Sequence, residues 1–213
     1  MPKSKSKRRK AAQAGQAGQS GSAGARRGRF GRLTPVRIGL FIVLAGLAVW
    51  ATVDYLGERQ GTESFQALAL RGAGALGRVE RLPDEGRNHV EDGTVVGYRT
   101  DPPVSGTHSR RWADPGVYRK RQPPERLVHS VEHGMIVIYY DRPAAAVMDR
   151  LEAWASLFGS PWSGVVLTPR EGLGQDIILT AWRRRLRMTA FDAAGAAAFV
   201  DAYRGRGPEH RVR

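Results

Sequence analysis

The chain has 213 residues, a formal net charge of +14 and no cysteine. The absence of thiols excludes disulfides, thiolate metal sites and a cysteine nucleophile. Eleven Lys and Arg residues, and no acid, lie within residues 1–37, so the other 176 residues carry only +3 (14 less 11). Because the basic character is local to the N-terminus, no nucleic-acid partner is expected for the body of the protein.

Residues 1–35 alternate clusters of Lys and Arg with Ala, Gln, Gly and Ser. Such a segment buries too little apolar surface to offset its chain entropy, which predicts a disordered basic tail. The sixteen residues from Ile38 to Val53 then carry no charge. Extended to residues 36–56, this apolar stretch reaches the roughly 20 residues that a helix needs to cross a bilayer, so we expect one transmembrane helix there.

The positive charge before this helix predicts its orientation. Basic residues favour the cytoplasmic side, which leaves the tail in the cytoplasm, where it contacts anionic lipid of the cell membrane, and places the C-terminal domain outside. A cleaved signal peptide is the alternative for this single-pass anchor. Against it, the apolar run is longer than an ordinary signal core, and no small-x-small cleavage site follows.

After the apolar stretch, residues 57–85 are rich in Gly, Arg and Glu. They predict a juxtamembrane spacer with at most one short helix. An extracytoplasmic domain is expected over 86–208, with a short tail at 209–213. Near its start, the β-branched run of residues 94–98 predicts a short strand.

A compact helix is predicted over residues 124–133. Proline fits the first turn of a helix, and Pro123 and Pro124 precede the acidic Glu125, which suits the positive end of the helix dipole. Gly134 provides the stop, because glycine readily takes the left-handed conformation that ends many helices.

The rest of the domain alternates strands and helices. The wholly apolar run 135–140 predicts a buried central strand. A helix is expected over 143–158 from apolar residues at steps of three and four, and the three consecutive arginines at 183–185 are expected to be an exposed charge cluster. Two further strands (164–168 and 176–182) and a last helix (190–203) complete an α+β fold, a small sheet covered by helices.

Four histidines of this domain are candidate metal ligands. His129 and His133 are four residues apart, so they share one face of the predicted helix. His108 and His89 lie in the loop-rich first half of the domain. Imidazoles without sulfur suit copper or zinc rather than calcium or magnesium. Four histidines would make a closed binding site, and three with a water would make a catalytic one.

Two alternatives to a metal-binding role stay open. The pattern His-x-x-Glu-His, with Glu132 before the second histidine, is that of inverted zincin peptidases, in which the acid activates a metal-bound water. A metal-dependent hydrolase with Glu132 as general base is therefore one alternative. The other is a non-enzymatic interaction domain of the cell envelope, whose histidines are structural and bonded to the backbone. Binding without catalysis is the leading hypothesis.

Two blocks of sequence resemble a known bacterial family. The blocks are Pro102-Pro103-Val104-Ser105-Gly106-Thr107-His108 and His129-Ser130-Val131-Glu132-His133-Gly134. Over about residues 86–208 the chain resembles the domain of unknown function 3105 family, whose members are typically single-span membrane proteins. The resemblance implies an extracytoplasmic domain on a membrane anchor, and it implies no activity.

Overall fold

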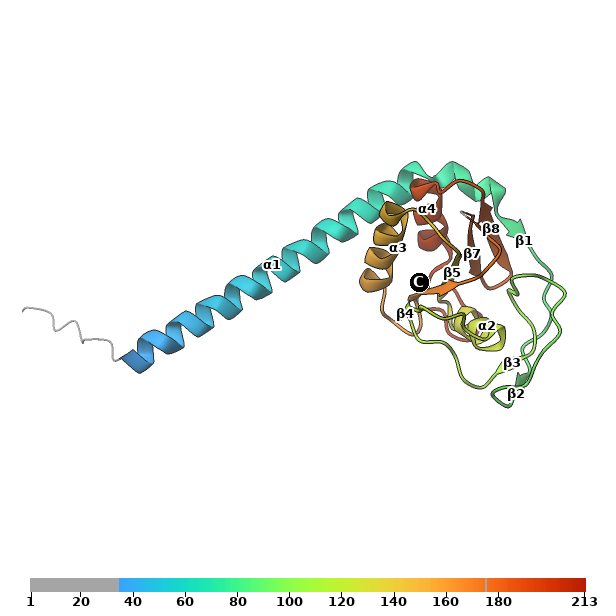
Figure 1. Ribbon diagram of the computed structural model, residues 1–213, viewed down its shortest axis with the longest axis horizontal. Helices are drawn as coiled ribbons and strands as arrows, with labels where there is room; N and C mark the ends of the chain where they lie inside the picture. Colours follow the sequence, from blue (N-terminus) through green and yellow to red (C-terminus); the bar gives the residue numbers. More distant parts are fainter. Residues whose placement is uncertain (1–34, 175) are drawn as a thin grey trace, which may run out of the picture. The chain divides into compact units, whose positions relative to one another are not determined.

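The computed structural model describes residues 35–174 and 176–213. The predicted disordered tail, residues 1–35, lies outside the described residues apart from Pro35. The helices are α1 (Pro35–Arg71), the 3-10 helix η1 (Ala73–Arg78), α2 (Pro124–His133), α3 (Ala145–Leu157) and α4 (Ala193–Tyr203). The strands are β1 (Glu80–Arg81), β2 (His89–Val90), β3 (His108–Ser109), β4 (Gly116–Val117), β5 (Ile136–Tyr140), β6 (Val165–Pro169), β7 (Ile177–Ala181) and β8 (Arg184–Met188) (Figure 1).

The first helix corrects one prediction. Among the residues that the structure describes, no helix is both long enough and apolar enough to cross a membrane. The prediction of a transmembrane helix over 36–56 is therefore wrong. Its uncharged part, Ile38 to Val53, is sixteen residues, or about 24 Å of helix against a hydrocarbon core of about 30 Å. The prediction reached a spanning length only by including the charged Arg37 and Asp54.

Helix α1 continues into the range that the sequence predicts as a spacer. It ends at Arg71, and η1 follows almost at once. The ring of Phe65 packs edge-on against Trp154, with centroids 5.4 Å apart, and against Phe158 at 4.8 Å. The C-terminal end of α1 is thus part of the domain's core.

The main sheet has six strands in the order β1-β8-β7-β5-β6-β4. Strands β4, β6 and β5 run parallel, whereas β7 is antiparallel to both β5 and β8. The predicted strands at 135–140, 164–168 and 176–182 are confirmed as β5, β6 and β7. The mixed sheet with helices agrees with the α+β class.

Strand β8 was not predicted; of the three arginines expected to be an exposed charge cluster, Arg183 is exposed, whereas Arg184 and Arg185 are partly buried. Arg184 and Arg185 begin this strand and pair with Ala181 and Thr180 of β7. Leu186 and Met188 alternate with arginines and are buried. In the sequence, these arginines obscure the alternation of buried apolar side chains that is typical of a strand.

Each face of the sheet has its own apolar cluster. On one face, alternate residues of β5 such as Ile136 and Ile138 pack with α3, α4 and the end of α1. On the other face, Val137 and Tyr139 pack with Leu127 and Val131 of α2. Figure 1 shows α2 between the sheet and the loops that carry β2 and β3.

Helix α2 has the predicted bounds. Pro124 opens it, and Gly134 ends it with a left-handed φ of 102°. The predicted strand at 94–98 is absent, and its residues are irregular. Glu125 uses a side-chain oxygen to accept a hydrogen bond from the backbone N–H of Val96 (3.0 Å). A side chain thus satisfies the backbone N–H of Val96 in place of a strand partner.

Candidate metal centre

The two-stranded sheet of β2 and β3 brings the first two histidines together. The strands run parallel, with His89 directly opposite His108. The backbone N–H of His108 donates to the carbonyl of Asn88 (2.9 Å). The two rings meet edge to face with centroids 4.6 Å apart. His108 is fully buried, whereas His89 is exposed.

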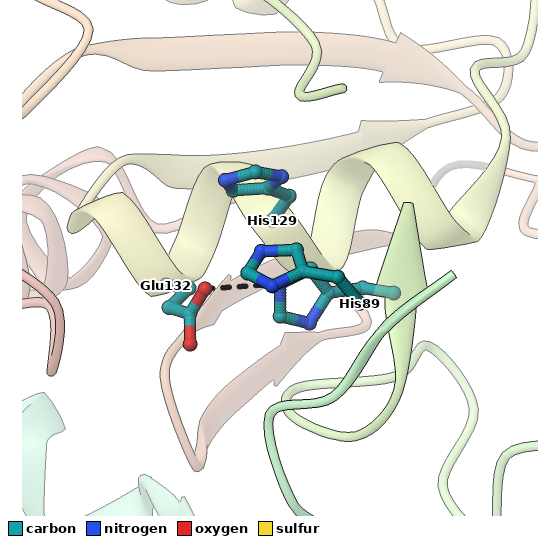
Figure 2. A group of neighbouring side chains, drawn as sticks. His89, His129 and Glu132 are labelled. Carbon is teal, nitrogen blue, oxygen red and sulfur yellow. Dashed lines mark ion pairs between the residues drawn. The ribbon is translucent and has the colours of Figure 1, made fainter. Parts of the chain in front are cut away.

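Helix α2 supplies the other two members of the cluster. His129 and Glu132 are three residues apart, and residues at this spacing lie on one side of a helix. Figure 2 shows both side chains projecting from the helix beside the ring of His89. The centroid of the His129 ring lies 5.1 Å from that of His89 and 4.9 Å from that of His108.

These four residues form what we call the inner group: His89, His108, His129 and Glu132. Each has one ligand atom that lies within 4.8 Å of the ligand atoms of the other three. Within the group, His108 Nε2 and Glu132 Oε2 are 2.9 Å apart. Ligands of one tetrahedral zinc ion are about 3.3 Å apart for metal–ligand bonds of about 2 Å. The group therefore needs only small side-chain movements to hold an ion.

Backbone carbonyls orient two of the rings. His108 Nδ1 lies 2.9 Å from the carbonyl oxygen of Gly106, and His129 Nδ1 lies 2.7 Å from that of Ser109. Because a carbonyl can only accept, each Nδ1 must carry a proton and donate it. Each Nε2 is left to face the group. Metal-bound histidines are typically held by such an outer hydrogen bond.

The protonation of the group follows from burial and from one carboxylate. Burial lowers the pKa of His129 to about 4, so this imidazole is neutral at pH 7. Burial alone would also lower the pKa of His108, but the contact with Glu132 and the hydrogen bond to Gly106 outweigh it and raise that pKa. Burial opposes ionisation of Glu132, yet His108 lowers the pKa of this carboxyl, which is therefore ionised. The buried carboxylate of Glu132 is thus paired with His108, whose pKa is raised, while His129 stays neutral.

His133 lies outside the inner group. It belongs to a second set, the outer group, with His129 and Glu209, again with ligand atoms within 4.8 Å of one another. Its Nε2 lies 3.0 Å from Glu209 Oε2. The ring stacks on Trp162, with centroids 4.2 Å apart and planes 23° apart. Burial lowers the pKa of His133.

The structure thus divides the four predicted histidines. His89, His108 and His129 come together, and Glu132 joins them where the sequence suggested a fourth histidine. Glu209 was missed because the pattern of charges at 209–213 resembles a solvated tail. In the structure the backbone N–H of Glu209 bonds to the carbonyl of Glu132 (3.5 Å). This contact between the chain end and α2 has no local sequence signal.

Comparison with known proteins places the chain in a family. A family model described as a protein of unknown function, DUF3105, matches residues 89–213. The chain belongs to the DUF3105 family. Its matched region begins at His89 and includes every residue of the inner and outer groups. No curated protein and no solved structure matches the chain.

The family assignment confirms the resemblance seen in the sequence. The single-span membrane anchor that the resemblance implied is not confirmed. The DUF3105 domain therefore stands as an α+β domain with a His/Glu group that is able to hold a metal ion.

Proposed function

We propose that this DUF3105 domain binds one transition-metal ion, copper(II) or zinc, through the inner group. The observation that carries the proposal is the convergence of three imidazoles and one carboxylate from three separate elements, β2, β3 and α2. Three nitrogens and one oxygen, with no thiolate, suit zinc or copper(II). The carboxylate of Glu132 would offset part of the charge of the ion.

Burial of the group supports binding over a purely structural role. The side chain of Glu132 is only 5 % exposed and that of His108 is 0 % exposed. The Nε2 atom of His108 is buried and makes no hydrogen bond of good geometry, although it lies 2.9 Å from the Glu132 carboxylate. A histidine kept only for packing would ordinarily have both ring nitrogens hydrogen-bonded. A metal ion between the two atoms would satisfy both.

Elemental analysis of the full chain tests the proposal. Metal-free protein is dialysed against zinc or copper(II) and then against buffer, and we expect about one ion per chain. His129→Ala and His108→Ala are expected to lower the affinity by more than the roughly 10–100-fold typical of an outer-shell loss. His210→Ala is the matched control, since His210 belongs to neither group. Retention of one ion by both His129→Ala and His108→Ala would refute the proposal.

The hydrolase alternative gives Glu132 a different task. A general base must be free to take a proton from a metal-bound water, whereas a ligand gives its oxygen to the ion. The 2.9 Å approach of Glu132 to His108 favours the ligand role. Glu132→Gln therefore should lose metal. If this variant keeps the ion and the wild type hydrolyses a peptide substrate that the variant does not, Glu132 acts as the base instead.

A further inference from the structure

The inner and outer groups share one residue, His129. Its Nδ1 donates to the carbonyl of Ser109 (2.7 Å), which leaves Nε2 as its one atom free for a metal. One lone pair binds one ion. Both groups therefore cannot be complete at the same time, and one of two ions in this cluster would lack His129 as a ligand.

The two groups differ in how many ligands they offer. The inner group has four, and the outer group has three: His129, His133 and Glu209. Each protein ligand that replaces a water adds to the affinity, so an ion is held more tightly in the inner group. The outer group would hold an ion with open positions that water or a second molecule can occupy.

The outer group is built from a rigid part and an exposed part. The side chain of His133 is 3 % exposed and is fixed against the rings of Trp162 and Trp112, at centroid distances of 4.2 and 4.7 Å. The side chain of Glu209 is 45 % exposed. A carboxylate at the surface beside a fixed imidazole is suited to take an ion from solution and to release it again.

We propose that the domain holds one transition-metal ion in either of two overlapping positions that share His129, and that His133 and Glu209 form the position through which the ion enters and leaves. In the transfer, the ion keeps its bond to His129 Nε2. It exchanges His133 and Glu209 for His89, His108 and Glu132; the proton that His108 Nε2 carries when His108 is charged passes to solvent, and no proton or electron is consumed at His129. This inference rests on the proposed metal-binding function.

Tryptophan fluorescence reports on the outer position, because Trp162 and Trp112 flank His133 and bound copper(II) quenches nearby indoles. Full-length metal-free protein is mixed with copper(II) in a stopped-flow instrument. We expect a fast phase whose rate rises with copper concentration, followed by a slower phase whose rate does not. The fast phase is entry at the outer position, and the slow phase is transfer to the inner one.

Glu209→Gln is the test variant, because its side chain is half exposed and its loss leaves the core intact. The fast phase should slow by about 10-fold or more, at least the effect that loss of an outer-shell partner has on metal affinity, because the outer group loses one of its three ligands. Glu171→Gln, an exposed acid in the loop between β6 and β7, should keep both phases. Unchanged kinetics in Glu209→Gln would overturn the two-position inference, as would two ions per chain at saturation. Absence of bound metal in the wild type would instead overturn the proposed function.

Discussion

The two faces of the central sheet are built for different purposes. One face is covered by a large cluster of apolar side chains from α3, α4 and the end of α1. The other face carries a smaller cluster, to which α2 contributes only Leu127 and Val131. Yet eight of the ten residues of α2 are buried, among them His129, Glu132 and His133. We call the face of the sheet that packs with α3, α4 and α1 the core face, and the face that packs with α2 the site face.

The difference shows how a polar site can be buried in a small domain. On the core face, apolar area removed from water supplies the stability. On the site face, the sheet anchors α2 by one side only. Loops with β2 and β3, and the chain end near Glu209, cover the opposite side of the helix. Burial of the inner group therefore depends on loops, while folding depends on the core face.

The largest loss of stability is expected on the core face, from Phe199→Ala. Phe199 is fully buried and packs beside Tyr203, with ring centroids 4.8 Å apart. Removing a buried phenyl ring costs about 3–5 kcal/mol, a large part of the total stability of an ordinary domain. Urea unfolding followed by circular dichroism measures the loss. Molecules that remain folded should bind metal as the wild type does; a specific loss of metal affinity would mean that the two faces are coupled.

A smaller loss of stability is expected from a substitution where the chain end contacts α2. A methyl group on Gly207 would lie 2.0 Å from the carbonyl oxygen of Glu132. Gly207→Ala forces these backbones apart, at a cost of about 3 kcal/mol for overpacking. Because the displaced segment carries Glu209, metal affinity should fall as well. Gly159→Ala, where a methyl group meets nothing within 4 Å, is the control. Equal metal affinities in the two variants would show that the position of the chain end does not affect metal binding.

Much of the fold could be predicted because its signals are local. The bounds of α2 follow from Pro124 and Gly134, and the wholly apolar run of β5 marks a central strand. Strand β8 escaped prediction because arginines alternate with Leu186 and Met188. The error over 36–56 arose from counting charged residues at both ends of an apolar run that is too short.

The site could be predicted only in part. The spacing of His129 and His133 on one helix places them on one face, but their rings serve different groups. Which histidine joins His129 depends on the pairing of β2 with β3 and on the docking of the chain end. Both contacts join residues that are far apart in the sequence. A single sequence carries no periodic pattern for such contacts, so Glu209 had no signal.

A hydrogen-bonded serine holds α2 to the loops on the site face. The buried hydroxyl of Ser130 accepts from the backbone N–H of Ala113 (3.0 Å) and donates to its carbonyl (2.8 Å). Ser130→Ala leaves the carbonyl of Ala113 without this donor and its N–H with only the 3.4 Å contact to the carbonyl of Arg126, which should cost about 2 kcal/mol. Ser156→Ala, at an exposed position of α3, should change the free energy of unfolding by no more than about 0.5 kcal/mol. Equal values for the two would show that the loop is held by other contacts.

The smallest effect is expected at Asp92, and it should depend on pH. Arg126 donates to its carboxylate (Nε–Oδ1, 2.8 Å), as does the hydroxyl of Ser109 (2.9 Å), and these contacts lower the pKa of Asp92 from its ordinary 3.8 to about 2. A depressed folded-state pKa stabilises the native state above the unfolded pKa, and this contribution is lost as the pH falls. Wild type should therefore exceed Asp92→Asn in stability by a constant amount above about pH 5.

That difference should shrink between pH 3.8 and about 2 and vanish below it, since both forms then carry an uncharged side chain. Urea unfolding of both proteins across this range measures it, with the exposed Asp149→Asn on α3 as the control. Salt should weaken the difference, because the pair is partly exposed and is screened. A difference that stays constant down to pH 2 would show that Asp92 acts through its shape and hydrogen bonds alone. The loop with His89 would then be held to α2 without help from the charge of Asp92.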